Sequence, residues 1–368
     1  AQPGAGAATG AQHTVSPRRP VTVALLIPGT AEAEGPARLG RAINNAAALA
    51  IGELRDPVLS VRVYNTAGDP AVAGDVARAA LSDGADIFIG PLFAANTAEV
   101  ATAVAAAGRK VISFSTITDV AGGPVTIIGY TPEAEVRRIL RYAGEQGLRN
   151  IGIFYPLNDY GEAALKGARA VAAEGAVQIV ATGGYERSFR GIETASAPFA
   201  QQARSVGVDA VLLPAGGREL QAVGSFLNFH GLDPAQVKYL GLGQWNSRAT
   251  FGEAALRGGW FPAPDPGAFA RFAGRYRAQY GEEPPLLSDL GYTGVQIVGQ
   301  MLATARAQGS EAAFTEAELT RPQGFEGALG RVRLLPDGTA EHPLAILEVG
   351  EGRFIDRAPA ARPPATGS

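Results

Sequence analysis

The chain has no cysteine among its 368 residues. Disulfides, thiolate nucleophiles and cysteine-based metal sites are therefore excluded. Histidine is scarce as well: His13, His230 and His342 lie far apart in the sequence, which argues against a histidine-rich metal site. We expect neither a metal nor any other cofactor.

A strong charge of one sign and long apolar runs are also absent. The net charge is -3, and no cluster of Lys and Arg is interleaved with aromatic residues. This argues against a nucleic-acid partner. No apolar segment approaches the ~20 residues that a membrane-spanning helix requires, and no charged-then-apolar signal sequence opens the chain.

Recognisable catalytic motifs are missing too. The sequence contains no GxxxxGK phosphate loop, no GxSxG nucleophile elbow and no HExxH zinc motif. The adjacent carboxylates Glu282 and Glu283 lie in a polar turn, where a solvated role is expected. We therefore expect a non-enzymatic binding protein, with an enzyme as the minority hypothesis.

Small residues and turn formers are abundant, with 48 Gly and 25 Pro. The length favours two domains, each large enough to bury a sizeable core. Residues 1–20 are small and unpatterned, as in a flexible tether left after removal of a signal or after truncation. Residues 356–368, rich in Ala and Pro, are expected to be disordered.

Residues 86–118 show the repeating unit of the chain most clearly. An apolar run at 87–89 without polar alternation indicates a strand buried on both faces of a parallel sheet. Gly90 and Pro91 end it, a helix is predicted over 97–107, and a second buried strand starts at Val111. Since ligands of open α/β sheets lie beyond the carboxyl ends of strands, loops 91–96 and 113–118 should border a binding cleft.

The same alternation extends through most of the chain and predicts an α/β fold with two Rossmann-like, doubly wound parallel-sheet lobes. A second series begins after residues 130–133. After residue 243 the pattern changes to two helices, over 267–280 and 286–307, and then to an antiparallel meander over 331–335, 342–349 and Phe354. The other predicted strands are 21–27, 58–64, 125–130, 151–155, 177–181, 210–213 and 237–240. The other predicted helices are 36–54, one that follows the turn at 65–70 and buries Val72, Val76 and Ala80, 134–146, 161–173, 197–206 and 219–229.

Taken in order, these features resemble the type I periplasmic solute-binding protein fold, the family that includes leucine/isoleucine/valine-binding proteins. The resemblance covers residues 21–355. Six stretches in the expected order carry it: ALLIPGTAEAEGPARLG, NTAGDP, FIGPLFAANTAEVA, VISFST, PLNDYG and FEGALGRVRLLPDGTAEHPLAILEVGEGRF.

The resemblance implies three crossovers between the lobes, near residues 129–132, 244–250 and 321–327. Lobe 1 would then comprise residues 21–130 and 250–323, and lobe 2 residues 131–249 and 324–355. The wording GPLF, VISFST, GYTPEAEV and LGLGQW is similar to the LpoA-like penicillin-binding protein activators of proteobacteria. That similarity implies a lipid-anchored regulator of peptidoglycan synthesis in the periplasm, although no cysteine is present to carry the anchor.

The resemblance also implies a set of ligand contacts in an interlobe cleft. Ala94 and Ala95 replace the hydroxyls that the family offers to a ligand carboxylate, so Asn96 or backbone amides would hold an anion, unless Thr97 only caps the helix. Tyr160 would close over the ligand from the second lobe. The expected ligand residues are Thr30, Phe93, Ala95, Asn96, Ser113, Ser115, Thr116, Tyr160, Gly217, Arg218, Gln244 and Trp245.

Some of these expectations have a plain structural alternative. The hydroxyls of Ser113, Ser115 and Thr116 would equally cap local backbone, and Trp245 is as consistent with a core position. Beside Tyr160, Asp159 and Gly161 are as consistent with the simple start of a helix. The family's acidic partner for a ligand ammonium falls near Gly243 or Gln244, and neither carries charge. Because a buried ammonium without a counter-charge is costly, this argues against a standard α-amino acid unless another carboxylate substitutes.

The expected function is therefore a periplasmic ligand-binding protein of the Leu/Ile/Val-binding type, closest to the penicillin-binding protein activators. The alternative is a solute receptor of an ABC importer for amino acids or related metabolites. The implied partners are a small molecule and either a peptidoglycan synthase or an ABC permease, with a lipid anchor to the membrane as a further implication of the activator hypothesis.

Overall fold

The computed structural model describes residues 14–360. Within them the chain forms two compact units: unit 1 holds residues 14–129 and 267–342, and unit 2 holds 130–266 and 343–360. The chain passes from one unit to the other three times. Both units have the expected α/β architecture.

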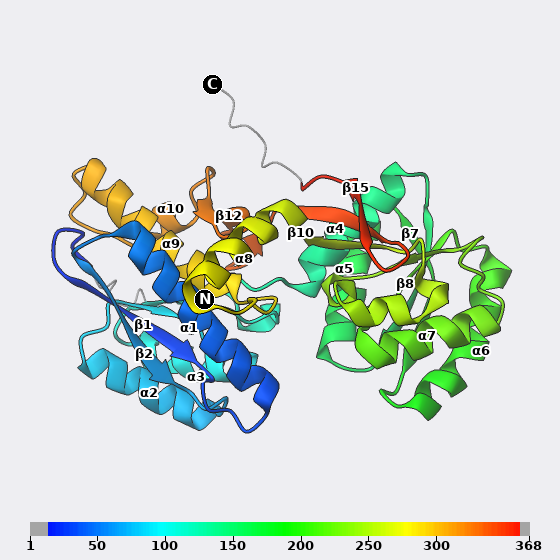
Figure 1. Cartoon of the computed structure of the whole chain (residues 1–368), viewed down its shortest axis with the longest axis horizontal. Helices are drawn as coiled ribbons and strands as arrows, with labels where there is room; N and C mark the ends of the chain where they lie inside the picture. Colours follow the sequence, from blue (N-terminus) through cyan, green and yellow to red (C-terminus); the bar gives the residue numbers. More distant parts are fainter. Residues whose placement is uncertain (1–13, 361–368) are drawn as a thin grey trace, which may run out of the picture. The chain divides into compact units, whose positions relative to one another are not determined.

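Unit 1 is built on a parallel five-stranded sheet with the order β2-β1-β3-β4-β5 (Figure 1). Alternate residues of each central strand face opposite sides, and both sides are covered, which explains the apolar runs without polar alternation. The strands are β1 (Val21–Ile27), β2 (Leu59–Asn65), β3 (Ile87–Ile89), β4 (Lys110–Ser113) and β5 (Val125–Ile127).

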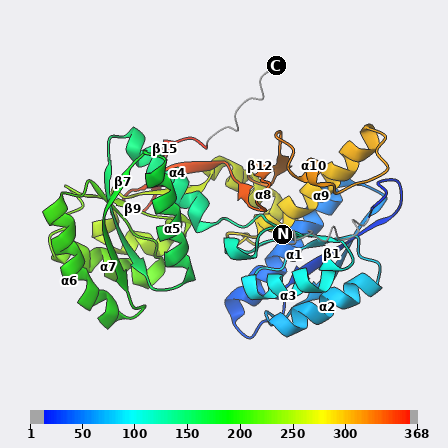
Figure 2. The same ribbon diagram turned by 180° about the vertical axis from the view of Figure 1, so that it is seen from behind.

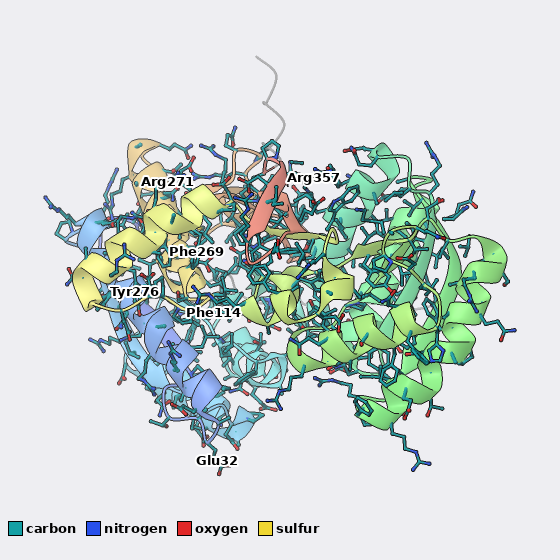
Figure 3. The ribbon with its side chains drawn as sticks, turned by 45° about the vertical axis from the view of Figure 1, so that its right-hand side comes forward. Glu32, Phe114, Phe269, Arg271, Tyr276 and Arg357 are labelled. Carbon is teal, nitrogen blue, oxygen red and sulfur yellow. The ribbon has the colours of Figure 1, made fainter. Side chains whose placement is uncertain are left out.

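Helices α1 (Glu34–Leu54) and α9 (Asp289–Ala307) pack together in unit 1, and α2 (Pro70–Ser82) packs with α3 (Ala94–Ala105). Small residues allow the close approach of α1 and α9: a Cβ added to Gly291 would lie 2.2 Å from the carbonyl oxygen of Ile43. Helix α8 (Pro266–Tyr280) carries Tyr276, labelled in Figure 3, whose hydroxyl lies 3.2 Å from Asn45 Nδ2 of α1.

Unit 2 has a seven-stranded sheet with the order β15-β14-β10-β9-β8-β6-β7. Its strands are parallel from β7 to β10, whereas β14 and β15 each pair antiparallel to the neighbouring strand. The strands are β6 (Asn150–Pro156), β7 (Gln178–Tyr185), β8 (Ala210–Leu212), β9 (Lys238–Leu240), β10 (Trp260–Pro264), β14 (Leu344–Val349) and β15 (Phe354–Ala358).

Two pairs of helices enclose this sheet. Helices α4 (Pro132–Glu145) and α5 (Asp159–Ala173) pack together and are seen from behind in Figure 2. They share one apolar core with the sheet. Helices α6 (Phe189–Val206) and α7 (Gly217–Phe229) share another. The remaining short elements are Thr118–Val120, Gly243–Trp245, Arg248–Gly252, Ala254–Leu256, α10 (Glu316–Leu319), β11 (Phe325–Gly327), β12 (Gly330–Leu334) and β13 (Ala340–Glu341).

The second and third crossings lie later than expected. Strand β10 pairs with β9 and β14 and therefore keeps residues 250–266 in unit 2. Strands β11, β12 and β13 form a separate antiparallel sheet, which keeps residues 324–342 in unit 1. The predicted single meander is thus divided between the units, because β14 and β15 join the sheet of unit 2.

Both ends of the described chain are more ordered than expected. Val15 is buried and bridges to Ala313, so part of the predicted tether packs on unit 1. Residues 356–358 belong to β15, which pairs with β14, and are not a disordered tail. The remainder of the two predicted flexible ends, residues 1–13 and 361–368, lies outside the described residues, as does His13.

Candidate functional site

The predicted ligand residues cluster at equivalent places in the two units. In unit 1 the strand order reverses between β1 and β3, and in unit 2 between β6 and β8. The loops after these strands lie at topological switch points, where doubly wound folds bind ligands. Thr30 and Phe93 follow β1 and β3, whereas Tyr160 and Gly217 follow β6 and β8.

The start of α3 provides free backbone donors in unit 1. Its N-cap residue, Phe93, makes no side-chain capping bond, and Ala95 at the second helical position is exposed. Asn96 is buried, with Nδ2 3.4 Å from the carbonyl oxygen of Asp69. The amides of this turn, and not the Asn96 side chain, are therefore available to an anion.

The hydroxyls after β4 are largely committed to local bonds. Ser113 Oγ lies 2.9 Å from Thr97 Oγ1 and 3.1 Å from the Pro91 carbonyl oxygen, and it accepts the Ser115 amide at 3.0 Å. Ser115 Oγ in turn accepts the Ile117 amide at 3.1 Å. A ligand at Ser113 or Ser115 would have to replace these bonds, so the geometry favours the local-capping alternative for both.

Thr30 and Thr116 are more accessible. Thr30 is exposed, and its hydroxyl accepts a hydrogen bond from Asn65 Nδ2 at 2.5 Å. Thr116 is half-buried, and within residues 14–360 its hydroxyl has no hydrogen-bond partner. Thr97 is a buried first-turn residue whose hydroxyl donates back to the Phe93 carbonyl at 3.0 Å. The N-cap is Phe93, so Thr97 does not cap the helix, but its hydroxyl is engaged within it.

A buried carboxyl group joins three elements at the corresponding edge of unit 2. Glu135, in the first turn of α4, is 7% exposed. Its Oε2 accepts the Gly243 amide at 3.0 Å and lies 3.5 Å from the Tyr160 hydroxyl. Burial raises the pKa of Glu135 to about 8, although both hydrogen bonds oppose the shift. The sequence analysis missed this residue.

Two loops of unit 2 meet beside this carboxyl group. Gly217 has a left-handed φ of 57°, which a residue with a side chain would rarely adopt. Arg218 is exposed and makes no ion pair with another described residue. The exposed Gln244 rests against Gly216, where an added Cβ would lie 2.9 Å from Gln244 Cβ.

Trp245 is a core residue and not a ligand contact. Its side chain is 0% exposed within the core that α6 and α7 share with the sheet, and Nε1 donates to the Leu213 carbonyl at 3.1 Å. An added Cβ at Gly241 would lie 2.1 Å from the indole, so the ring fills the space beside this glycine. The prediction of Trp245 as a ligand residue is therefore wrong, and its core alternative is right.

Other features of the described residues do not add to this site. No group of three or more His, Asp or Glu side chains among them could hold a metal ion, and none of their helices combines the length and apolarity needed to cross a membrane. One cavity of about 490 Å³ in unit 1 is lined by Thr304 and Arg321 among others. Another of about 710 Å³ lies between β7 and α6, and neither lining includes a predicted ligand residue.

Comparison with solved structures shows the same fold at low sequence identity. A putative branched-chain amino acid ABC transporter protein from Rhodospirillum rubrum is 16% identical with a TM-score of 0.78, covering 92% of this chain and 99% of that one. The branched-chain amino acid transporter substrate-binding protein LivJ from Streptococcus pneumoniae, in complex with isoleucine, is 18% identical with a TM-score of 0.65 and coverages of 94% and 100%.

A third structure, from Rhodopseudomonas palustris, is a solute-binding protein of an ABC transporter in complex with 3,4-dihydroxybenzoic acid. It is 19% identical with a TM-score of 0.65 and coverages of 94% and 98%. No curated protein sequence matches the chain. The model of one family, Periplasmic binding protein, matches residues 20–353. Because this match spans nearly the whole chain, the protein belongs to the periplasmic binding protein family.

Proposed function

We propose that the protein is a periplasmic solute-binding receptor of the Leu/Ile/Val-binding type that serves an ABC importer. The family match over residues 20–353 carries this proposal. It is supported by the similar structures, which include an isoleucine complex and a 3,4-dihydroxybenzoic acid complex of ABC transporter binding proteins. The two switch-point edges, each with polar or backbone donors, provide the chemistry that a small solute needs.

The ligand contacts in unit 1 suit a carboxylate. Backbone amides at the start of α3 have no side-chain cap, and the partial positive charge of a helix N-terminus favours an anion. Thr30 and Thr116 flank this turn in the adjoining loops with accessible hydroxyls. In unit 2 the remaining predicted contacts are Tyr160, Gly217, Arg218 and Gln244.

The test is a ligand screen on the purified chain. Native mass spectrometry before and after unfolding and refolding would reveal a retained solute. Thermal shifts with amino acids and aromatic acids would then identify the class. Ligand at 100 times its Kd should stabilise the native state by about 2.7 kcal/mol.

A charge variant tests the carboxylate contact specifically. Ala95→Asp places a negative charge in the first turn of α3, where it should repel a bound carboxylate while favouring the helix. Ala98→Asp is the matched control, because Ala98 is also exposed on α3 but lies a turn further along. Equal affinity in both variants would contradict the assignment of this turn.

The penicillin-binding protein activator hypothesis remains the second candidate. It depends only on the similarity of four sequence stretches to those of the activators: GPLF, VISFST, GYTPEAEV and LGLGQW. An activator would bind a peptidoglycan synthase through its surface and need no solute. Absence of any retained or added solute, together with capture of a purified peptidoglycan synthase, would favour it over the receptor.

A further inference from the structure

The cavity of about 490 Å³ in unit 1 has a strongly polar lining. It lies between the C-terminal end of α9 and the short helix α10, both labelled in Figure 1. Seven of its nine lining residues have polar side chains, and the other two are Ala312 and Ala317. Since ligand pockets are usually lined by larger apolar side chains, an aliphatic or aromatic solute would find little to contact here.

This cavity lies at the sheet edge opposite to the candidate solute site. Lys110 is the first residue of β4, and its Nζ lies 2.8 Å from Glu316 Oε2 of α10. Helix α10 therefore lies at the amino ends of the parallel strands. Thr30 and Phe93 instead follow the carboxyl ends of β1 and β3. A molecule in the cavity would thus be distinct from a solute held by those loops.

Arg321 is fixed in the cavity wall by its neighbours. Its Nε donates to the Gly324 carbonyl at 2.8 Å, and Nη1 donates to Thr304 Oγ1 at 3.0 Å. Nη2 lies 3.4 Å from Gln300 Oε1, and the guanidinium carbon lies 4.0 Å from the centre of the Phe325 ring. An arginine has five N–H donors, so two remain for a molecule in the cavity.

The carboxyl group of Glu318 lines the same cavity without a side-chain partner. Both of its oxygens are buried, and no side chain among residues 14–360 donates a hydrogen bond to them. Burial raises the pKa of Glu318, although the amides of Thr315 and Phe314 and the charge of Arg321 oppose the shift. Because a buried acceptor without enough donors is costly, a donor that enters the cavity is favourable beside this group.

The lining groups define the chemistry of a suitable ligand. Glu318 and Arg321 carry opposite charges, so a solute with a net charge would be repelled by one of them. Glu318 needs donors and Arg321 needs acceptors, and a hydroxyl group is both. The side chains of Gln308 and Gln323 also line the cavity and are exposed, and their amide groups have no partner within the described part of the chain.

We propose that this cavity is a second binding site, for a neutral solute with several hydroxyl groups such as a monosaccharide or a polyol. Hydroxyl groups of the solute donate to Glu318 and accept from the two remaining N–H groups of Arg321. The Gln308 and Gln323 amides bind further hydroxyl groups. The inference goes beyond the proposed receptor function, which concerns the other edge of the sheet.

The experiment titrates the full chain with glucose, galactose, mannose, ribose, sorbitol and myo-inositol by isothermal calorimetry and ligand-observed NMR. Thermal shifts are unsuitable here, because sugars at high concentration stabilise proteins by exclusion from their surface. Glucuronate serves as a charged analogue of glucose. None of these probes belongs to the amino acid and aromatic acid screen of the receptor function, so the two proposals can fail separately.

Three variants locate the binding site. Ala317→Tyr fills the cavity from an exposed position, which should preserve the fold. Ala303→Tyr is the matched control, because Ala303 is exposed on α9 but does not line the cavity. Glu318→Gln keeps the shape of the side chain and removes its charge.

We expect saturable binding of one molecule of a neutral probe per chain, which is lost in Ala317→Tyr and kept in Ala303→Tyr. Glu318→Gln should weaken binding about tenfold through loss of a charge-assisted hydrogen bond. The absence of saturable binding by all six neutral probes overturns the inference, as does glucuronate binding as tight as that of glucose. Binding that Ala317→Tyr leaves unchanged also overturns it, and it leaves the receptor function intact because the sugar then binds elsewhere.

Discussion

Unit 1 and unit 2 each carry, near a crossing of the chain, a titratable side chain whose pKa is shifted by its surroundings: His342 is half-buried, Glu135 is buried, and the two pKa values shift in opposite directions. In unit 1, His342 precedes the third crossing, and its Nε2 lies 3.0 Å from the Ile128 carbonyl oxygen. Burial lowers its pKa to about 4. In unit 2, Glu135 follows the first crossing, and burial raises its pKa to about 8.

One physical cause acts on both groups, because a low-dielectric environment favours the neutral form of either. The consequences differ at neutral pH. His342 is already neutral well below pH 7 and serves as a fixed structural contact. Glu135 has a pKa of about 8, so it is mostly protonated at neutral pH and loses its proton just above neutral pH. The comparison therefore places the pH-responsive chemistry in unit 2.

The largest expected effect tests whether the loop after β9 is anchored in the core of unit 2. Trp245→Ala removes a fully buried indole and its bond to the Leu213 carbonyl. We expect the free energy of unfolding to fall by about 3–5 kcal/mol. Urea denaturation measures it, with the exposed neighbour Gln244→Ala as the control, for which a change within about 0.5 kcal/mol is expected. Unchanged stability in Trp245→Ala would place the indole outside the core.

The next effect concerns Glu135 and the alkaline side of the stability profile. Between the ordinary Glu pKa of 4.5 and about 8, the native state holds a proton that the unfolded state has lost. The free energy of unfolding should therefore fall as pH rises through this window, by up to about 1.4 kcal/mol per pH unit. Chemical denaturation from pH 5 to 8 measures the slope. Glu135→Gln should flatten it, and an equal slope in the variant would refute the burial argument.

For His342 we expect the free energy of unfolding to depend on pH with a similar slope of opposite sign, over a narrower pH range. Between a pKa of about 4 in the native state and 6.5 in the unfolded state, the unfolded chain binds the extra proton. Stability should be complete above pH 6.5 and should decline as pH falls toward 4, by up to about 1.4 kcal/mol per pH unit. His342→Asn should flatten only this acidic limb. If His342→Asn instead changed the slope of the unfolding free energy at alkaline pH, the assignment of the acidic effect to His342 and of the alkaline effect to Glu135 would be wrong.

The smallest effect separates local capping from ligand binding in unit 1. Ser113→Ala removes the hydroxyl shared with Thr97 and Pro91, and we expect a loss of about 1 kcal/mol in unfolding free energy. Thr116→Ala, at a half-buried hydroxyl without such bonds, should leave stability nearly unchanged. Isothermal titration with the identified solute then shows which of the two hydroxyls contributes to affinity. If only Thr116→Ala lost stability, Thr116 and not Ser113 would be the hydroxyl that stabilises the local backbone.

Much of the fold could be predicted because its signals are local. The uninterrupted apolar run at 87–89 and the turn residues Gly90 and Pro91 define β3 without knowledge of the partners. Helix α6 was harder: its prediction began at 197, next to Pro198, but the helix starts at Phe189 after the N-cap Ser188. The N-cap serine signals that start, and a proline inside a helix masked it.

The site was less predictable because its contacts are distant in sequence. The absence of an acid at Gly243 and Gln244 is visible in the sequence. The buried carboxyl group beside them is not, since the bond from Gly243 to Glu135 spans 108 positions. The crossing positions were misplaced for the same reason: β10 belongs to unit 2 through pairing with β14, more than eighty residues later.

The packing of α1 against α9 has a consequence for biogenesis. A growing chain makes α1 and the five-stranded sheet of unit 1 within its first 127 residues, but α9 begins only at residue 289. Until then the part of α1 that packs on α9 has no partner, although α1 also contacts β1 and β2, and unit 2 likewise lacks β14 until residue 344. Neither unit can complete its core before most of the chain has emerged. A chain that stops short of residue 289 therefore exposes apolar surface in both units. Such a chain is expected to be bound by chaperones and degraded by proteases.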